Sequence, residues 1–159
     1  MNDPSIAVFG EGQIRGSAWS DSSAHELGRA VGTYLVRDGR SKMTLGRDSA
    51  EQSARLYRAL TNGLLSTGMH VLDVGVVTTP VLEYSVGYFD ADGGVQINAG
   101  PAADSVFLIF RGQSQLDDVE IHKLRALFEQ GDYEAQIGQL ETKDANRPYS
   151  AMDRSTADR

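Results

Sequence analysis

The chain contains no cysteine, which excludes a disulfide framework and a thiolate metal site. This absence fits a reducing compartment, and we expect a cytoplasmic protein. The longest apolar run, residues 106–110, is far shorter than the roughly 20 residues that span a bilayer. The start Met-Asn-Asp-Pro also lacks the basic flank and apolar segment of a targeting signal. We therefore expect no membrane association.

Positive charge is scarce and dispersed. Fifteen Lys and Arg residues face 22 Asp and Glu residues, for a formal net charge of −7. No basic patch stands out along the sequence, so we expect no nucleic acid partner, because binding to nucleic acid depends on clustered cations that neutralise phosphates. His25, His70 and His122 have no metal-ligand spacing, so we expect no metal site. With 159 residues, the chain suits one domain.

Apolar residues at helical spacing predict four helices. We expect them at about 24–38, from Ser49 to near Gly68, at 80–89 and at 116–130. Pairs with capping-box spacing predict three of the starts, namely Ser23 with Glu26, Ser49 with Gln52, and Asp117 with Glu120. In the third helix, Thr79 is expected to cap a first turn that begins with Pro80.

Short runs rich in Val, Ile, Leu and Phe alternate with these helices and predict strands at 6–9, 43–45, 71–74, 95–97 and 106–110. This alternation predicts a three-layer α/β/α domain with a mostly parallel mixed sheet. The unbroken run at 106–110 is typical of a strand covered on both faces. We expect residues 1–142 to form this domain, and residues 143–159 to be a polar tail or the start of an interdomain linker.

Several short motifs follow one another in a fixed order. They are Phe9-Gly10-Glu11-Gly12-Gln13-Ile14-Arg15-Gly16, then Gly46-Arg47-Asp48, then Thr78-Thr79-Pro80, and then Gly93-Gly94 before an apolar strand. In this order and spacing, residues 6–140 resemble the first domain of the α-D-phosphohexomutases, the phosphoglucomutase and phosphomannomutase family. The sequence also departs from the family pattern, since Gln13 replaces an aspartate, Ala50 an arginine and Gln52 a serine.

The largest departure is in the loop that carries the family's phosphoserine. The family pattern T-A-S-H-N-P aligns with Asn98-Ala99-Gly100-Pro101, which places Gly100 at the nucleophile. The rest of the loop is shortened, and Phe107 falls at a family lysine. Ser105 stands close by and remains an alternative, displaced nucleophile. The resemblance therefore implies a degenerate phosphoserine loop with no catalytic residue.

The resemblance also implies which other groups the reaction needs. Phosphoryl transfer between a serine and two sugar hydroxyls requires an oxygen nucleophile, a divalent metal and a clamp for the second phosphate. The family binds Mg²⁺ through a later domain that this chain lacks, so we expect no cofactor here. Arg15 and Arg47 are the candidate substrate-binding residues. Arg15 could instead pair with Asp48, and Arg47-Asp48 could be a brace at a helix entry.

On this basis we expect a non-catalytic, phosphohexomutase domain I-like module linked to sugar-phosphate or carbohydrate metabolism. The alternative is an N-terminal fragment or subunit of a phosphoglucomutase or phosphomannomutase, which is an intramolecular phosphotransferase and an isomerase. We expect sugar phosphates to bind weakly at most, through Arg15. A protein partner or self-association would use the aromatic residues Tyr84, Tyr88 and Phe89, unless they belong to the core.

Overall fold

The computed structural model describes residues 7–10, 12–100 and 104–157. Ile6, Glu11 and Pro101, which figure in the sequence motifs and predictions, lie outside the described residues. The elements in chain order are β1 (Ala7–Gly10), β2 (Gln13–Gly16), α1 (Asp21–Arg37), β3 (Lys42–Arg47), α2 (Glu51–Leu65), β4 (His70–Val76), α3 (Thr79–Tyr88), β5 (Gly93–Ala99), β6 (Ser105–Arg111), β7 (Ser114–Gln115), α4 (Asp118–Gln130), β8 (Gln139–Thr142) and α5 (Asn146–Ala157).

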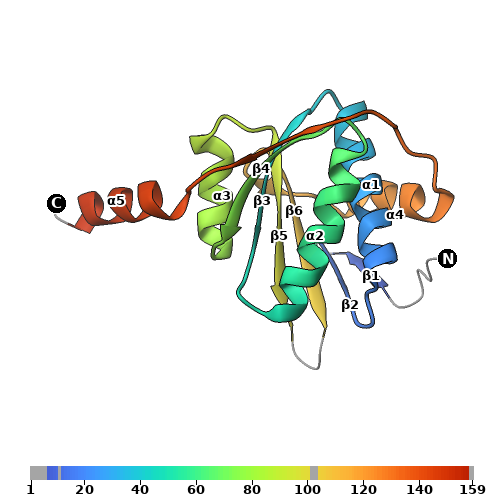
Figure 1. The fold of residues 1–159 in the computed structure, drawn as a ribbon, viewed down its shortest axis with the longest axis horizontal. Helices are drawn as coiled ribbons and strands as arrows, with labels where there is room; N and C mark the ends of the chain where they lie inside the picture. Colours follow the sequence, from blue (N-terminus) through green and yellow to red (C-terminus); the bar gives the residue numbers. More distant parts are fainter. Residues whose placement is uncertain (1–6, 11, 101–103, 158–159) are drawn as a thin grey trace.

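The strands form one mixed sheet in the order β1-β2-β6-β5-β3-β4-β8, with β7 paired to β6. β3 runs parallel to both β4 and β5, and β8 runs parallel to β4. The strands β1, β2, β6 and β5 pair antiparallel with one another. Helices cover both faces of this sheet, as Figure 1 shows, so the prediction of a three-layer α/β/α domain is confirmed.

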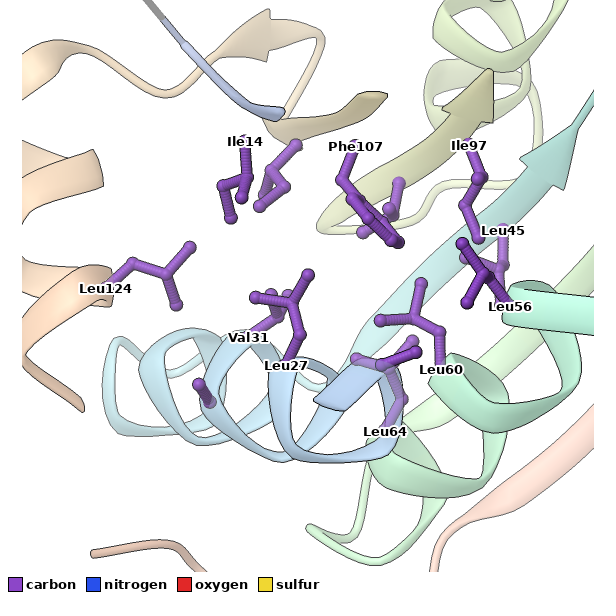
Figure 2. Packing of buried hydrophobic residues seen from close by; sticks show 14 of the residues in the cluster. Ile14, Leu27, Val31, Leu45, Leu56, Leu60, Leu64, Ile97, Phe107 and Leu124 are labelled. Atoms are coloured by element: carbon purple, nitrogen blue, oxygen red, sulfur yellow. The ribbon is translucent and has the colours of Figure 1, made fainter. Parts of the chain in front are cut away.

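The main core lies on the face covered by α1, α2 and α4. Leu27 and Val31 of α1 meet Leu60 of α2 and Phe107 of β6 there, all of them buried (Figure 2). A smaller core under α3 on the opposite face contains Val81, Leu82 and Phe110. The apolar positions that predicted the helices therefore face these two cores.

The opposite face is covered only in part. Phe107 and Ile109 of β6 point into the main core, whereas Val106, Leu108 and Phe110 point to the other face, where Phe110 is buried and Leu108 packs partly buried against the smaller core. The prediction that residues 106–110 are covered on both faces therefore holds at Leu108 and Phe110, while Val106 is only partly buried. α3 packs against β3 and β5, and Phe110 near the end of β6 lies in the same small core, whereas Val8 of β1 and Arg15 of β2 are exposed on this face.

Of the three predicted capping boxes, the structure confirms one. α4 has the predicted capping box of Asp117 and Glu120 and ends at Gly131 in the left-handed region (φ 73°). The other two predicted capping boxes were wrong. α1 begins earlier, at Asp21, and its cap is Ser20. α2 has Ala50 at its N-cap with no side-chain hydrogen bond.

The prediction for the third helix was partly right. α3 does carry a proline in its first turn. However, Thr79 already belongs to the helix, and the N-cap residue is Thr78, whose side chain makes no capping hydrogen bond.

The segment after residue 138 is more structured than its polar composition suggests. β8 extends the parallel part of the sheet beside β4, and Ala145 is fully buried in the smaller core. α5 then projects away from the sheet (Figure 1), with Tyr149 packed against this core. The domain boundary between residues 142 and 143 stays a prediction.

Within the described ranges, none of the helices combines the length and the apolar character needed to cross a membrane.

Candidate functional site

Gly100 lies directly after β5, where the chain turns back into β6. Its backbone N–H donates to the carbonyl oxygen of Asp104 at 2.7 Å, and Ala99 pairs with Ser105 at the end of the antiparallel ladder. A Cβ placed on Gly100 would meet Asp104 Cβ at 3.4 Å and Val106 Cγ2 at 3.5 Å, which are ordinary van der Waals contacts. Neither space for a Cβ nor backbone geometry therefore requires glycine here.

Ser105 is buried at the start of β6. Its side chain is 2% exposed, and its Oγ lies 2.5 Å from the Nε2 donor of Gln52. The same amide donates to the carbonyl oxygen of Asp104 at 2.7 Å. Because Ser105 alternates with Val106 along the strand, it points into the main core, away from the face that carries Arg15. This burial argues against Ser105 as a displaced nucleophile.

Asp48 joins the ends of two strands to the start of a helix. One carboxylate oxygen accepts the N–H of Ala99 at 2.7 Å, and the other accepts the N–H of Ala50 at 3.2 Å. Burial alone would raise the pKa of Asp48, but these two N–H groups and the nearby charge of Arg47 lower it below its ordinary value. Asp48 is therefore an ionised brace between β5 and α2 at neutral pH.

The two candidate arginines lie on opposite faces of the sheet. Arg15 is aligned with Val106, and Val106 with Asn98, so Arg15 shares the face of Asn98. Arg47 is aligned with Ile97 and therefore lies on the other face. Among the described residues, Arg15 forms no ion pair, and the suggested pairing with Asp48 is not observed. The fold thus does not bring these two guanidinium groups to one ligand, and their binding roles stay predictions.

Arg47 has neighbours that fit a structural role. Its Nη1 donates to the carbonyl oxygen of Asp48 at 3.0 Å, and its guanidinium lies 5.6 Å from the centre of the Tyr57 ring. The Tyr57 hydroxyl contacts the carboxylate of Asp73 and the carbonyl oxygen of Leu45. Burial, with Asp73 adding to it, raises the pKa of Tyr57 well above its ordinary value, so the phenol stays protonated.

Asp73 shapes the end of β4. It accepts the N–H of Gly75 at 2.9 Å, and Gly75 takes a left-handed conformation (φ 71°). The register between β3 and β4 shifts at this point, next to Leu45 and Gly46. This local irregularity sets the path of the loop that follows β4 and leads to Thr78 and Thr79.

A crevice of about 460 Å³ opens where β3, β4 and β5 end. Its lining residues come from the loops after β3 and β4, from the end of β5 and from the start of α5: Asp48, Ser49, Val76, Val77, Thr78, Thr79, Asn98 and Asn146. A chain of amides lies beside it. Buried Gln96 donates to the carbonyl oxygen of Val77 at 2.8 Å and to Asn98 Oδ1 at 3.0 Å, and Asn98 Nδ2 donates to Thr79 Oγ1 at 3.0 Å.

Sequence reasoning did not assemble this crevice. The sequence patterns gave Asn98 only as part of the phosphoserine-loop pattern, and Thr79 only as a helix cap and a member of the Thr78-Thr79-Pro80 motif. The usable signal was positional, because Asn98 lies at the end of β5 and Thr79 follows soon after the end of β4, and both strands belong to the parallel part of the sheet.

The aromatic residues of α3 are neither fully buried nor fully open. Tyr84 and Tyr88 stack with ring centres 5.3 Å apart, and Tyr149 of α5 meets Tyr84 edge-on. Tyr88 is 55% exposed. Their use in self-association stays a prediction.

In the part of the chain that the structure describes, no three His, Cys, Asp or Glu side chains are grouped so that they could hold a metal ion.

Comparison with known families gives one consistent answer. The profile described as "Phosphoglucomutase/phosphomannomutase, alpha/beta/alpha domain I" matches residues 7–134. The "Phosphoglucomutase/phosphomannomutase" of Thermococcus kodakarensis is 33% identical over 154 residues, which covers 89% of this chain and 34% of the relative. The "Phosphoglucosamine mutase" of Lactobacillus gasseri is 39% identical over 132 residues, covering 75% of this chain and 29% of the relative.

Solved structures agree with these sequence matches. A phosphoglucomutase/phosphomannomutase family protein from Burkholderia thailandensis superposes with a TM-score of 0.82 at 25% identity and covers 94% of this chain and 35% of that chain. A putative phosphomannomutase from Thermus thermophilus gives a TM-score of 0.81 at 24% identity and supports the fold alone. The present chain therefore spans about a third of the length of the proteins it resembles.

Proposed function

Because the chain belongs to the phosphoglucomutase/phosphomannomutase family and corresponds to its domain I, we propose that it is a non-catalytic domain I module linked to sugar-phosphate metabolism. One observation carries this proposal: Gly100 stands at the end of β5, at the position where the family pattern places the phosphorylated serine. In this proposal the phosphoserine loop is degenerate. The burial of Ser105 supports it, because a hydroxyl enclosed in the core does not replace the missing one.

The chemistry of the reaction supports the same conclusion. A phosphoryl group needs an oxygen acceptor, and glycine has no side-chain oxygen. The reaction also needs a metal ion to neutralise phosphate charge, and in the family a later domain supplies the metal-binding residues. Arg15 lies exposed on the open part of the sheet face, where its planar guanidinium can meet a phosphate in two parallel hydrogen bonds. One exposed arginine supports only weak binding of a sugar phosphate.

A second proposal is that the chain acts as a fragment or subunit of a larger mutase. The coverage of about a third of each relative favours it, because the groups missing here would then come from the remaining two thirds. The projection of α5 away from the sheet also favours it, since a helix with few contacts to its own domain is available to another one (Figure 1).

The first prediction concerns the phosphoryl acceptor. The chain, incubated with a hexose bisphosphate, is expected to take up no phosphate by mass spectrometry and to interconvert no glucose or mannose phosphates. The variant Gly100→Ser is expected to fold, because a Cβ fits at this position, and yet to remain inactive alone. A full-length relative serves as the positive control. Phosphate on Ser105, or turnover by Gly100→Ser alone, would contradict the non-catalytic proposal.

A complementation assay separates the two proposals. A relative that lacks its own domain I is mixed with the native chain or with Gly100→Ser. The subunit proposal expects turnover with at least one of them, and the serine variant should be the more active. The non-catalytic module proposal expects neither mixture to exceed the truncated relative alone.

A further inference from the structure

The crevice at the ends of β3, β4 and β5 lies where the sheet changes direction. β3 is followed by α2, which packs in the main core, whereas neighbouring β4 is followed by α3 on the opposite face. The two connections therefore leave adjacent parallel strands toward opposite sides, and an opening remains between them. In open α/β sheets, ligands bind in such openings beyond the carboxyl ends of the strands. The topology thus marks this crevice independently of Gly100 and Arg15.

The lining of the crevice is rich in groups that both donate and accept hydrogen bonds. Ser49, Thr78 and Thr79 contribute hydroxyls, and Asn98 and Asn146 contribute amides. Val76, which is 45% exposed, adds an apolar surface beside them. A ligand with several hydroxyl groups and some C–H surface matches this lining.

The charged side chain in the lining disfavours a phosphate. Of the described residues that line the crevice, only Asp48 is charged, and neither Lys nor Arg is among them. A phosphate would meet this carboxylate without a compensating cation, which is unfavourable in a partly enclosed site. A neutral hydroxyl can instead donate a hydrogen bond to the carboxylate, and such charge-assisted bonds are stronger than neutral ones.

Two lining side chains are held in place before any ligand arrives. Asn98 is fixed by Gln96 on one side and by Thr79 on the other, both at 3.0 Å. Because the Thr79 oxygen accepts from Asn98, its hydroxyl hydrogen remains free to donate outward. We propose that this crevice binds an uncharged sugar through its hydroxyl groups, with Asn98, Thr78 and Thr79 as the main contacts.

An amide-resolved NMR titration with D-glucose and with D-mannose tests the proposal. The expected result is saturable shifts at Ser49, Thr78, Thr79 and Asn98, with a Kd on the order of 10 mM, as an open crevice with few buried contacts implies. Thr78→Val keeps the shape of the side chain and removes a hydroxyl that makes no capping hydrogen bond, so the fold should not change. This variant and Asn98→Ala should each weaken binding at least three-fold.

Two controls separate this proposal from the preceding one. Asn62→Ala changes an exposed amide on α2 outside the crevice, and Arg15→Gln removes the candidate phosphate contact, so neither should alter hexose binding. The proposal is overturned by the absence of saturable shifts with both hexoses, or by shifts that Thr78→Val leaves unchanged. If glucose 6-phosphate shifts only residues around Arg15 and the hexoses shift nothing, the crevice proposal fails while weak sugar phosphate binding stands.

Discussion

Replacing Leu60 by aspartate is expected to unfold the domain. Leu60 is fully buried on the face of α2 that meets the sheet, and Figure 2 shows it among Leu56, Leu64 and Phe107. A carboxylate at this position would have no ionic partner in an apolar environment, which costs several kcal/mol. Total stabilities of single domains are only about 5–15 kcal/mol, so the substitution removes a large part of the folding free energy.

Thermal unfolding followed by circular dichroism measures this effect. Asn62→Asp is the matched control, because it introduces the same carboxylate on an exposed turn of the same helix, and its effect should stay within about 0.5 kcal/mol. A Leu60→Asp protein with the melting temperature of the native chain would show that this face of α2 is not in the core.

Replacing Gly63 by alanine is the second change with a large expected effect. α1 and α2 pack closely at two glycines, Gly28 and Gly63. A Cβ on Gly63 would lie 2.1 Å from the carbonyl oxygen of His25 and 3.0 Å from the backbone nitrogen of Arg29. Both contacts are backbone atoms of a helix and cannot move aside alone. The overpacking should cost about 1–3 kcal/mol net, although alanine favours a helix by about 1 kcal/mol over glycine.

Urea denaturation of Gly63→Ala, with the midpoint as the readout, tests this expectation. Gly87→Ala in α3 is the matched control, since its Cβ would meet only the flexible end of Gln113, at 3.0 Å. The control should be neutral or slightly stabilising, by up to about 1 kcal/mol. If Gly63→Ala also raises the midpoint, the two helices must lie further apart than the structure places them.

Local signals in the sequence predicted most of the helices, and specific misses show their limit. The capping box of Asp117 and Glu120 was right because both partners lie within one turn of α4. The predicted capping box of Ser49 and Gln52 was wrong because the Gln52 amide instead donates to Ser105 and to the Asp104 carbonyl oxygen. Both acceptors belong to the hairpin of β5 and β6, which is far away in the sequence. β2 was missed as well, since its four residues show no apolar run and become a strand only through pairing with β1 and β6.

The sequence alone determined which chemistry the chain lacks. Without cysteine, and with Gly100 at the end of β5, no thiolate and no acceptor oxygen at that position can arise from any fold, because a side-chain atom that is not encoded cannot be supplied by packing. The alternation of apolar strands and helices likewise determined the fold class, since the periodicity of each segment decides which faces must be buried.

Only the tertiary structure decided how the remaining polar groups meet. Arg15 and Arg47 are separated because the strand register places them on opposite faces of the sheet. The face on which each side chain lies depends on the pairing of several strands. Ser105 became a core hydroxyl for the same reason. The crevice joins Asp48, Thr79 and Asn98 because parallel strands far apart in the sequence end at one edge of the sheet, which only long-range pairing can bring about.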